Sequence, residues 1–305
     1  MTTRVASLPD ASWVEEVGAI DGLEVLAWDL AGDPPRQDIG LVVPAYMGDI
    51  TLLRHAARLP ALEAVQLLTA GYDDALPHLP DGAVLANAAG VHDASTAELA
   101  VGLTIAALRD LPAFVRAQQR GEWIDERPHD ALADRRVMVL GYGSVGRALA
   151  RRLEPFEVEL TAVASRARKG DDLVEHVHGI DELPYLLPDQ DVVVVVVPLT
   201  EATRTLVDAD FLRRLPDRAL VVNVARGPVA DTGAILREAG RLRFALDVTD
   251  PEPLPPDHPL WCAPGVLISP HTGGATTAFR PRAVRLLREQ LRRFAAGEEL
   301  ANVVA

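Results

Sequence analysis

The chain has 305 residues, 49% of them hydrophobic, with a formal net charge of −14 and an isoelectric point near 5.0. This length accommodates two domains that each bury a core, and the hydrophobic content excludes an intrinsically disordered chain. The negative charge argues against nucleic acids and anionic membrane surfaces as partners, because both require clustered cations. An anionic small molecule needs one or two local cations and is not excluded.

Cys262 is the single cysteine, which excludes an intrachain disulfide and fits a reducing compartment. Its apolar surroundings favour a buried structural thiol over a nucleophile. The N-terminal sequence lacks the apolar run of a signal peptide, and the longest apolar run, residues 192–197, is too short to span a membrane. We therefore expect a cytoplasmic protein.

The first hundred residues alternate short apolar runs with helix-like segments. Four runs are predicted strands, at residues 23–28, 39–43, 64–68 and 83–86. A helix is expected at 51–58, and this alternation favours a parallel α/β sheet. A longer helix is predicted at 95–111, apolar on most sides, as an interdomain helix would be.

A polar connecting segment, residues 117–133, leads into a second alternation. Its strands are expected at residues 136–140, 158–163, 191–197, 219–224, 243–247 and 265–269. Its helices are expected at residues 145–153, 209–215 and 232–239, and a last helix at about 275–295. The unbroken valine run 192–197 predicts a central parallel strand covered on both faces.

The glycine-rich stretch GYGSVG, Gly141 to Gly146, follows a predicted strand and opens a predicted helix. In that context glycines allow a tight turn (Gly141), close approach of a pyrophosphate (Gly143) and close helix packing (Gly146). The helix N-terminus near Ser144 offers N–H groups and a positive dipole end to phosphates. The pattern favours a dinucleotide site over an ordinary strand-to-helix turn.

The strand after this loop ends without the acid that would bind the ribose 2′-hydroxyl of NAD. Glu157 and Glu159 come too early, and Asp171 comes too late. Ser165 and Arg166 stand there instead, followed by further basic residues, and these suit a 2′-phosphate. The sequence favours NADP over NAD, the alternative being a solvated basic turn.

Three reactive side chains lie downstream of the glycine loop: Arg226 in NVARGP, Glu252 in DVTDPEP and His271 in SPHTGG. A guanidinium can hold an acid substrate, and an imidazole beside a carboxylate can move a proton. Each residue alone is more often structural. Together with the glycine loop they favour a dehydrogenase.

The chain resembles the D-isomer-specific 2-hydroxyacid dehydrogenase family, which includes glyoxylate/hydroxypyruvate reductases and phosphoglycerate dehydrogenases. The segments that carry the resemblance are LLTAGYDD, AELAVGLTIAALR, VMVLGYGSVGRALARRL, VVVPLTEATRTLVDADFL, VVNVARGPVAD, DVTDPEPLP and SPHTGGAT. It implies an α/β fold of two Rossmann-like, doubly wound parallel-sheet domains. Residues 1–96 and 275–305 would form a flavodoxin-like substrate domain, and residues 97–274 the dinucleotide-binding domain.

The resemblance also implies residue roles. Arg226 would bind the substrate carboxylate and carbonyl oxygen, His271 would be the acid/base, and Glu252 would orient His271 and raise its pKa. Substrate-binding positions would be Tyr46, Ala70, Gly71, Arg226 and His271. Cofactor-binding positions would be Gly141, Gly143, Ser144, Val145, Gly146, Ser165, Arg166, Pro198, Thr203, Val224, Ala225, Asp247 and Gly273. Family members commonly dimerise, so a homodimer is expected.

The resemblance is weakest in the substrate loop, residues 43–49. Phosphoglycerate dehydrogenases carry an arginine there, whereas this chain has no cation and offers Tyr46 and Met47 as apolar walls. A small or apolar 2-oxoacid is therefore favoured over a phosphorylated substrate, unless Arg54 supplies the missing cation.

Other functions remain as alternatives. Formate dehydrogenase is disfavoured because it pairs its histidine with glutamine, where this chain has Glu252. A dinucleotide-sensing scaffold of the same fold is disfavoured by the absence of basic tails, and no trailing regulatory domain is expected. No metal site is expected, and the remaining histidines are expected to be mostly structural: His55, His78, His129, His176, His178 and His258.

Overall fold

The computed structural model describes residues 3–125 and 127–305. Two compact units divide the chain: one contains the residues up to His92 and those from Thr277 on, and the other spans Asp93–Thr276. Within the described residues, no helix combines the length and the apolar character that a membrane crossing requires.

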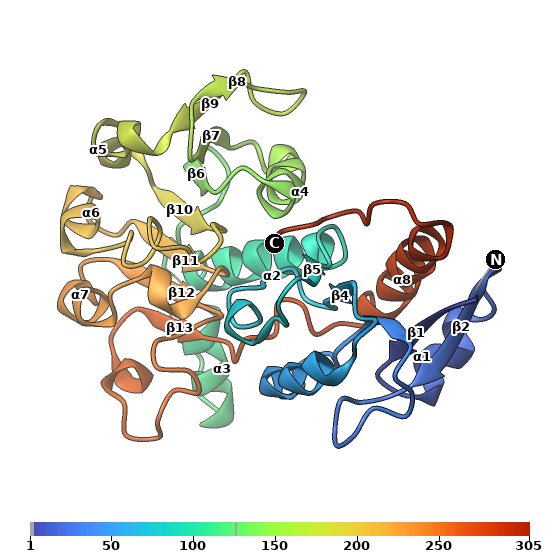
Figure 1. Ribbon diagram of the computed structural model, residues 1–305. Helices are drawn as coiled ribbons and strands as arrows, with labels where there is room; N and C mark the ends of the chain where they lie inside the picture. The colour runs from blue at the N-terminus through green and yellow to red at the C-terminus, as the bar shows by residue number, and fades with distance from the viewer. Residues whose placement is uncertain (1–2, 126) are drawn as a thin grey trace. The chain divides into compact units, whose positions relative to one another are not determined.

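The first unit contains a parallel sheet with the strand order β2-β1-β3-β4-β5 (Figure 1). Its strands are β1 (Arg4–Leu8), β2 (Leu23–Ala27), β3 (Ile39–Val42), β4 (Ala64–Gln66) and β5 (Val84–Ala86). This order is the flavodoxin-like one. Strand β1 was not predicted, because it is short and Ser7 interrupts its apolar pattern, yet it lies between β2 and β3 and is almost wholly buried.

Helices cover both faces of this sheet. Helices α1 (Ala11–Val17) and α8 (Phe279–Ala296) share one hydrophobic core with it, and the opposite core includes Leu53 and Ala56 of η1 (Ile50–Arg58). The helical stretch expected at residues 51–58 is confirmed as η1, which is a 3₁₀ helix. Another 3₁₀ turn is η2 (Leu76–His78).

The second unit contains a sheet with the strand order β13-β12-β11-β10-β6-β7-β9-β8. Its strands are β6 (Arg136–Leu140), β7 (Glu159–Ala164), β8 (Arg168–Lys169), β9 (His176–Gly179), β10 (Val192–Val195), β11 (Leu220–Asn223), β12 (Arg243–Leu246) and β13 (Val266–Ile268). All neighbours are parallel except β8 and β9. The six strands from β9 to β12 have the Rossmann order. Strands β8 and β9 were not predicted, because their sequences are short and polar.

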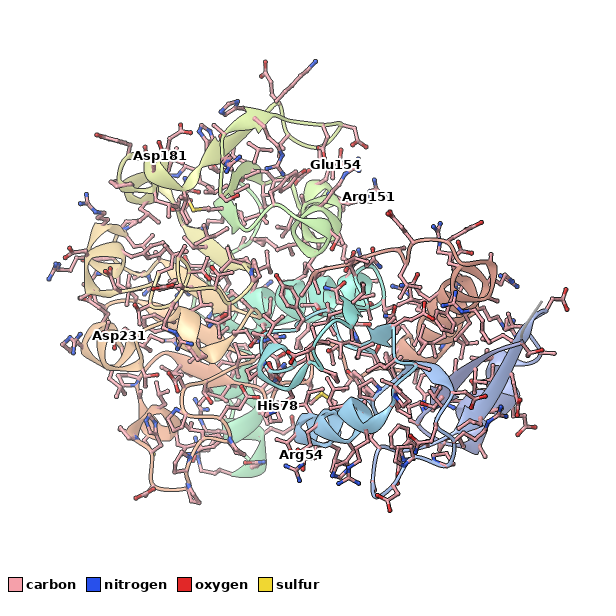
Figure 2. All side chains as sticks on the ribbon, viewed as in Figure 1. Arg54, His78, Arg151, Glu154, Asp181 and Asp231 are labelled. Atoms are coloured by element: carbon pink, nitrogen blue, oxygen red, sulfur yellow. The ribbon has the colours of Figure 1, made fainter. Side chains whose placement is uncertain are left out.

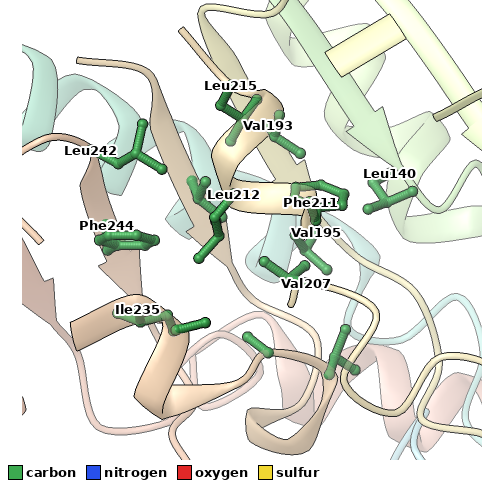
Figure 3. Close-up of a cluster of buried hydrophobic side chains, with 14 of the residues drawn as sticks. Leu140, Val193, Val195, Val207, Phe211, Leu212, Leu215, Ile235, Leu242 and Phe244 are labelled. Atoms are coloured by element: carbon green, nitrogen blue, oxygen red, sulfur yellow. The ribbon is translucent and has the colours of Figure 1, made fainter. Parts of the chain in front are cut away.

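The valine strand β10 lies between β6 and β11, as predicted, and both its faces are covered. Val193 and Val195 belong to a core with Phe211 of α6 (Ala209–Arg214) and Ile235 of α7 (Thr232–Glu238) (Figure 3). Val192 and Val194 belong to the core on the other face, with α2 (Asp93–Leu108) and α4 (Ser144–Leu153). The prediction of an α/β fold with doubly wound parallel sheets is confirmed.

The helix expected at residues 95–111 ends three residues earlier than predicted, and a second helix that was not predicted follows it. Helix α2 ends at Leu108, Asp110 has a left-handed backbone with φ of 53°, and α3 (Leu111–Gln119) follows. Pro112 explains the break, because proline inside a continuing helix lacks the N–H that the preceding turn needs. The short helical segments of this unit are η3 (Glu154–Phe156), η4 (Ile180–Glu182), α5 (Leu183–Leu186), η5 (Leu187–Asp189), η6 (Gly227–Val229) and η7 (Pro259–Cys262). The expected burial of Cys262 is wrong, because this residue ends η7 at the surface and is exposed.

Candidate active site

The glycine loop between β6 and α4 has a backbone that requires glycine at two positions. Gly141 has φ of 112°, and a Cβ there would lie 2.7 Å from the carbonyl carbon of Val196. A Cβ on Gly146 would lie 2.0 Å from the carbonyl oxygen of Gly141. At Gly143, by contrast, a Cβ would meet nothing within 4 Å. The loop is therefore tight where it meets protein and open where a ligand would approach.

The amino end of α4 fits an anion. Gly143 is the N-cap residue, and no side chain of the described residues caps this end of the helix. Ser144 and Val145 form its first turn, and the Ser144 hydroxyl donates to Asp93 at 3.3 Å. Backbone N–H groups and the helix dipole at such an end bind phosphate. The predicted residues Gly141 to Gly146 thus form a site that fits a dinucleotide pyrophosphate.

The turn after β7 lies directly beside this loop. The N–H groups of Gly141 and Tyr142 both donate to the carbonyl oxygen of Val163, at 2.9 and 3.0 Å. Ser165 and Arg166, which follow β7, are exposed. Arg168 donates to the carbonyl oxygen of Tyr142 at 2.7 Å and so supports the loop backbone.

One acid that the sequence analysis set aside lies near this turn. Asp171 comes too late in the sequence to follow β7, but the β8–β9 hairpin returns it to the loop. Its carboxylate accepts a hydrogen bond from the Tyr142 hydroxyl at 3.0 Å and pairs with Arg147 at 2.9 Å. Burial, together with this hydrogen bond, raises the pKa of Tyr142 to about 12. Asp171 is therefore engaged by protein groups, and recognising it would have required predicting the hairpin.

The loop after β10 carries two predicted cofactor residues, which differ in their exposure to solvent. Pro198 is exposed, whereas Thr203 is buried and its hydroxyl donates to the carbonyl oxygen of Pro198 at 2.6 Å. The same hydroxyl accepts the N–H of Thr200 at 2.8 Å. Thr203 thus shapes this loop through its side chain.

Arg226 follows β11, after Val224 and Ala225. The side chain of Asn223, buried at the end of β11, donates to the carbonyl oxygen of Arg226 and accepts the N–H of Ala225, both at 3.0 Å. Asn223 was not singled out from the sequence, although a polar residue ending an apolar strand is a usable signal. It fixes the backbone that carries the guanidinium.

The loops after β11 and β12 touch. A Cβ on Gly227 would lie 1.8 Å from the carbonyl oxygen of Thr249, so only glycine fits between them. This contact brings Arg226 into the neighbourhood of Glu252 and His271, and its charge affects the pKa of both.

Glu252 and His271 are paired. Nδ1 of His271 lies 2.5 Å from Oε1 of Glu252, and the two side chains are 34% and 39% exposed, respectively. The hydrogen bond to Glu252 raises the pKa of His271, while burial acts in the opposite direction. The hydrogen bond from His271 lowers the pKa of Glu252. An ionised carboxylate thus favours the imidazolium and leaves Nε2 as the nitrogen that can face a substrate.

Asp247 holds the loop of His271. Its buried carboxylate accepts hydrogen bonds from the Ser269 hydroxyl at 2.6 Å and from the N–H groups of Thr272 and Gly273 at 2.9 Å. A Cβ on Gly273 would lie 3.0 Å from the Asp247 carboxylate, which explains the glycine. The two predicted cofactor residues, Asp247 and Gly273, therefore pair with each other.

The remaining predicted substrate residues lie in the first unit, whereas the trio lies in the second. The ring of Tyr46 stacks on Phe279, with centroids 3.9 Å apart, and burial raises its pKa. The backbone of Ala70 and Gly71 is held through its carbonyl oxygens, which accept hydrogen bonds from Asn87 and Thr69, each at 2.7 Å.

Known proteins resemble the chain along most of its length. The model of the D-isomer specific 2-hydroxyacid dehydrogenase NAD-binding domain matches residues 101–273. A mouse glyoxylate reductase/hydroxypyruvate reductase is 31% identical over 84% of this chain and 83% of its own length. A glyoxylate reductase of Aeropyrum pernix is 32% identical over 92% of this chain and 89% of its own.

Solved structures agree with these relatives. A D-isomer specific 2-hydroxyacid dehydrogenase from Xanthobacter autotrophicus Py2, in complex with NADPH and MES, is 30% identical with a TM-score of 0.81, covering 100% of this chain and 98% of its own. The family model spans both the glycine loop, Gly141 to Gly146, and the three residues Arg226, Glu252 and His271. The chain therefore belongs to the D-isomer specific 2-hydroxyacid dehydrogenases, NAD(P)-dependent oxidoreductases that act on the CH–OH group of 2-hydroxyacids.

Proposed function

We propose that the protein reduces a small 2-oxoacid to the D-2-hydroxyacid, with Arg226 binding the acid and His271 transferring the proton. The 2.5 Å pair between His271 and Glu252, beside the loop of Arg226, is the observation that carries this proposal. Bound NAD(P)H supplies the hydride for the 2-carbon. The family assignment gives the reaction class, which is hydride transfer between a nicotinamide and a 2-hydroxyacid. In this proposal the His271–Glu252 pair supplies the proton that reduction of the 2-oxoacid requires.

In this proposal Arg226 holds the carboxylate and the carbonyl oxygen of the substrate. A planar guanidinium can grip a planar carboxylate with two parallel hydrogen bonds. The Asn223 side chain holds the backbone of Arg226, and this fixes the point from which the guanidinium extends toward the substrate. Its positive charge also polarises the carbonyl and so assists hydride addition.

His271 is proposed as the general acid in reduction and the general base in oxidation. Glu252 is a positioning residue that holds Nδ1 and leaves Nε2 to deliver the proton to the carbonyl oxygen. Because Glu252 raises the pKa of His271, the imidazolium needed for reduction persists to higher pH.

We propose NADP as the preferred cofactor. Ser165 and Arg166 are exposed in the turn beside the glycine loop, where a 2′-phosphate would need a hydroxyl donor and a cation. Asp171, the nearby acid, is engaged by Tyr142 and Arg147. The similar Xanthobacter enzyme was crystallised with NADPH, which supports the same choice.

The proposed substrate is a small 2-oxoacid such as glyoxylate or hydroxypyruvate, and the first unit is the proposed substrate domain. Two of the similar proteins are named for reduction of these acids. Tyr46 and the exposed Met47 offer an apolar wall without a cation, which favours a small side group over a phosphorylated one.

We propose that the protein is a homodimer and that it lies in the cytoplasm. Exposed apolar side chains gather on α3 and the segment after it, where Val115 is 54% and Trp123 94% exposed. Such a patch on a charged protein is typical of an interface. Sedimentation equilibrium of the wild type and of Trp123→Asp would test this, since a monomer in both would contradict it.

Turnover with a panel of 2-oxoacids tests the function. Glyoxylate, hydroxypyruvate, pyruvate and 3-phosphohydroxypyruvate should each be assayed with NADPH and with NADH. We expect oxidation of NADPH with the small acids and poor turnover of the phosphorylated one. No cofactor oxidation on any of the four would refute the proposed reaction and favour a dinucleotide-sensing scaffold.

A further inference from the structure

Three metal-ligating side chains lie together at β9 and η4, on residues that neither the nucleotide loop nor the trio includes. His176, His178 and Glu182 each offer one ligand atom, and these atoms all lie within 4.8 Å of one another. Across residues 3–125 and 127–305 this is the one group of three or more His, Cys, Asp or Glu side chains with such spacing. The sequence had suggested structural histidines here.

The strand places the two histidines on one face. Successive side chains of a strand point to opposite sides, so His176 and His178 share a side while Val177 points into the core. Their rings meet edge to face, with centroids 4.7 Å apart. His-X-His on a strand is therefore a ready pair of imidazole ligands.

Glu182 is held in place to complete the set. Its Oε1 accepts the N–H of Gly179 at 2.7 Å, and its Oε2 lies 2.8 Å from Nδ1 of His178. Figure 2 labels Asp181, which precedes Glu182 on the segment between β9 and α5.

We propose that His176, His178 and Glu182 bind a divalent transition-metal ion such as Zn²⁺ or Ni²⁺, with water in the remaining positions. Two imidazole nitrogens and one carboxylate oxygen suit these ions, whereas Mg²⁺ and Ca²⁺ require oxygen ligands. Capping of η4 requires only Glu182, which accepts the N–H of Gly179. The third side chain, His176 on the same face, makes the set a chelating one.

The distances require small adjustments. Ligand atoms about 2.0–2.2 Å from Zn²⁺ in a tetrahedral site lie about 3.3 Å apart. The His178 and Glu182 atoms, at 2.8 Å, must separate slightly, and the exposed His176 ring must rotate inward. The backbone N–H of Gly179 keeps the glutamate oriented while this happens.

Calorimetric titration of the full-length protein, without a histidine tag, tests the site. Ni²⁺ and Zn²⁺ are titrated separately at mildly alkaline pH, without cofactor or phosphate, and Mg²⁺ serves as a comparison ion. We expect one Ni²⁺ or Zn²⁺ per chain, no uptake of Mg²⁺, and weaker binding in acid because ligand imidazoles must be unprotonated.

Variants assign the ion to these residues. His176→Ala, a substitution at an exposed side chain, and Glu182→Gln should each weaken binding by at least about tenfold, since loss of a supporting contact alone costs that much. His78→Ala, at a histidine outside the set, should bind like the wild type. The proposal is overturned if the wild type takes up neither ion stoichiometrically, or if His176→Ala binds as tightly as the wild type.

Discussion

The backbone N–H of His271 donates to the carbonyl oxygen of Asp247 at 2.7 Å, while the carboxylate of the same aspartate accepts the N–H groups of the two residues that follow the histidine. His271 itself has a left-handed backbone, with φ of 51°. A residue other than glycine adopts this conformation at a cost, and the surrounding structure must hold it there. Asp247 supplies that support.

The first prediction concerns this support. Asp247→Asn turns an NH₂ group toward one of the backbone N–H groups that the carboxylate now accepts. A buried donor left without an acceptor costs about 1–3 kcal/mol, so urea unfolding should show that loss together with a lower kcat. Asp257→Asn, at an exposed aspartate, is the matched control and should change neither quantity. Unchanged stability and kcat in Asp247→Asn would contradict the support described here.

The second prediction concerns proton transfer. His271→Ala removes the proposed acid/base, and loss of such a group lowers the rate by about 10²–10⁴-fold. Binding of NADPH, measured by its fluorescence, should be retained, because the glycine loop is untouched. A variant that keeps the wild-type kcat would remove His271 from the mechanism.

The third prediction concerns pH. The hydrogen bond to Glu252 raises the pKa of His271, so Glu252→Gln should lower it toward the ordinary value. Reduction needs the protonated imidazole, and its kcat/KM falls as pH rises through that pKa. The falling limb should therefore move to lower pH in the variant. Profiles of kcat/KM against pH check this, and a limb that stays in place would mean that Glu252 does not control the titration.

The fourth prediction concerns the cofactor. Arg166→Ala should weaken NADPH about 10–100-fold, which corresponds to the loss of one hydrogen bond with a charged group, and leave NADH nearly unchanged. Arg151→Ala, on helix α4 and labelled in Figure 2, is the matched control. Michaelis constants for both cofactors measure the effect. Equal weakening of NADPH and NADH would argue against a 2′-phosphate contact.

The sequence predicted most of the second unit because its strands are apolar and its glycine loop is specific. The valine run predicted a central covered strand, and β10 occupies that place. Strands β1, β8 and β9 were not predicted because their own sequences are weak strand signals: Ser7 interrupts the apolar run of β1, and β8 and β9 are short and polar. The break before α3 was visible as Pro112, but the apolar pattern runs through it.

The residues of the candidate site also fall into those that the sequence singled out and those that it did not. Arg226, Glu252 and His271 were found because each lies in a recognisable motif, and the structure pairs Glu252 with His271. Asn223 was not singled out and Asp171 was set aside, because their contacts depend on the folded loops. The roles of Thr203 and Asp247 could not be seen either, since a hydroxyl or carboxylate that faces protein has the same sequence appearance as one that faces a ligand.

Gly227 leaves no space for even a methyl group against the carbonyl oxygen of Thr249. The loop of Arg226 and the loop of Glu252 are consequently mechanically coupled, and a shift of one displaces the other. Arg226 and Glu252 are thus carried by two loops in direct backbone contact, and Glu252 is hydrogen-bonded to His271. In the proposed function, Tyr46 and Met47 belong to neither of these loops, so a change in the accepted acid at those two positions would leave the proposed proton-transfer pair unaltered.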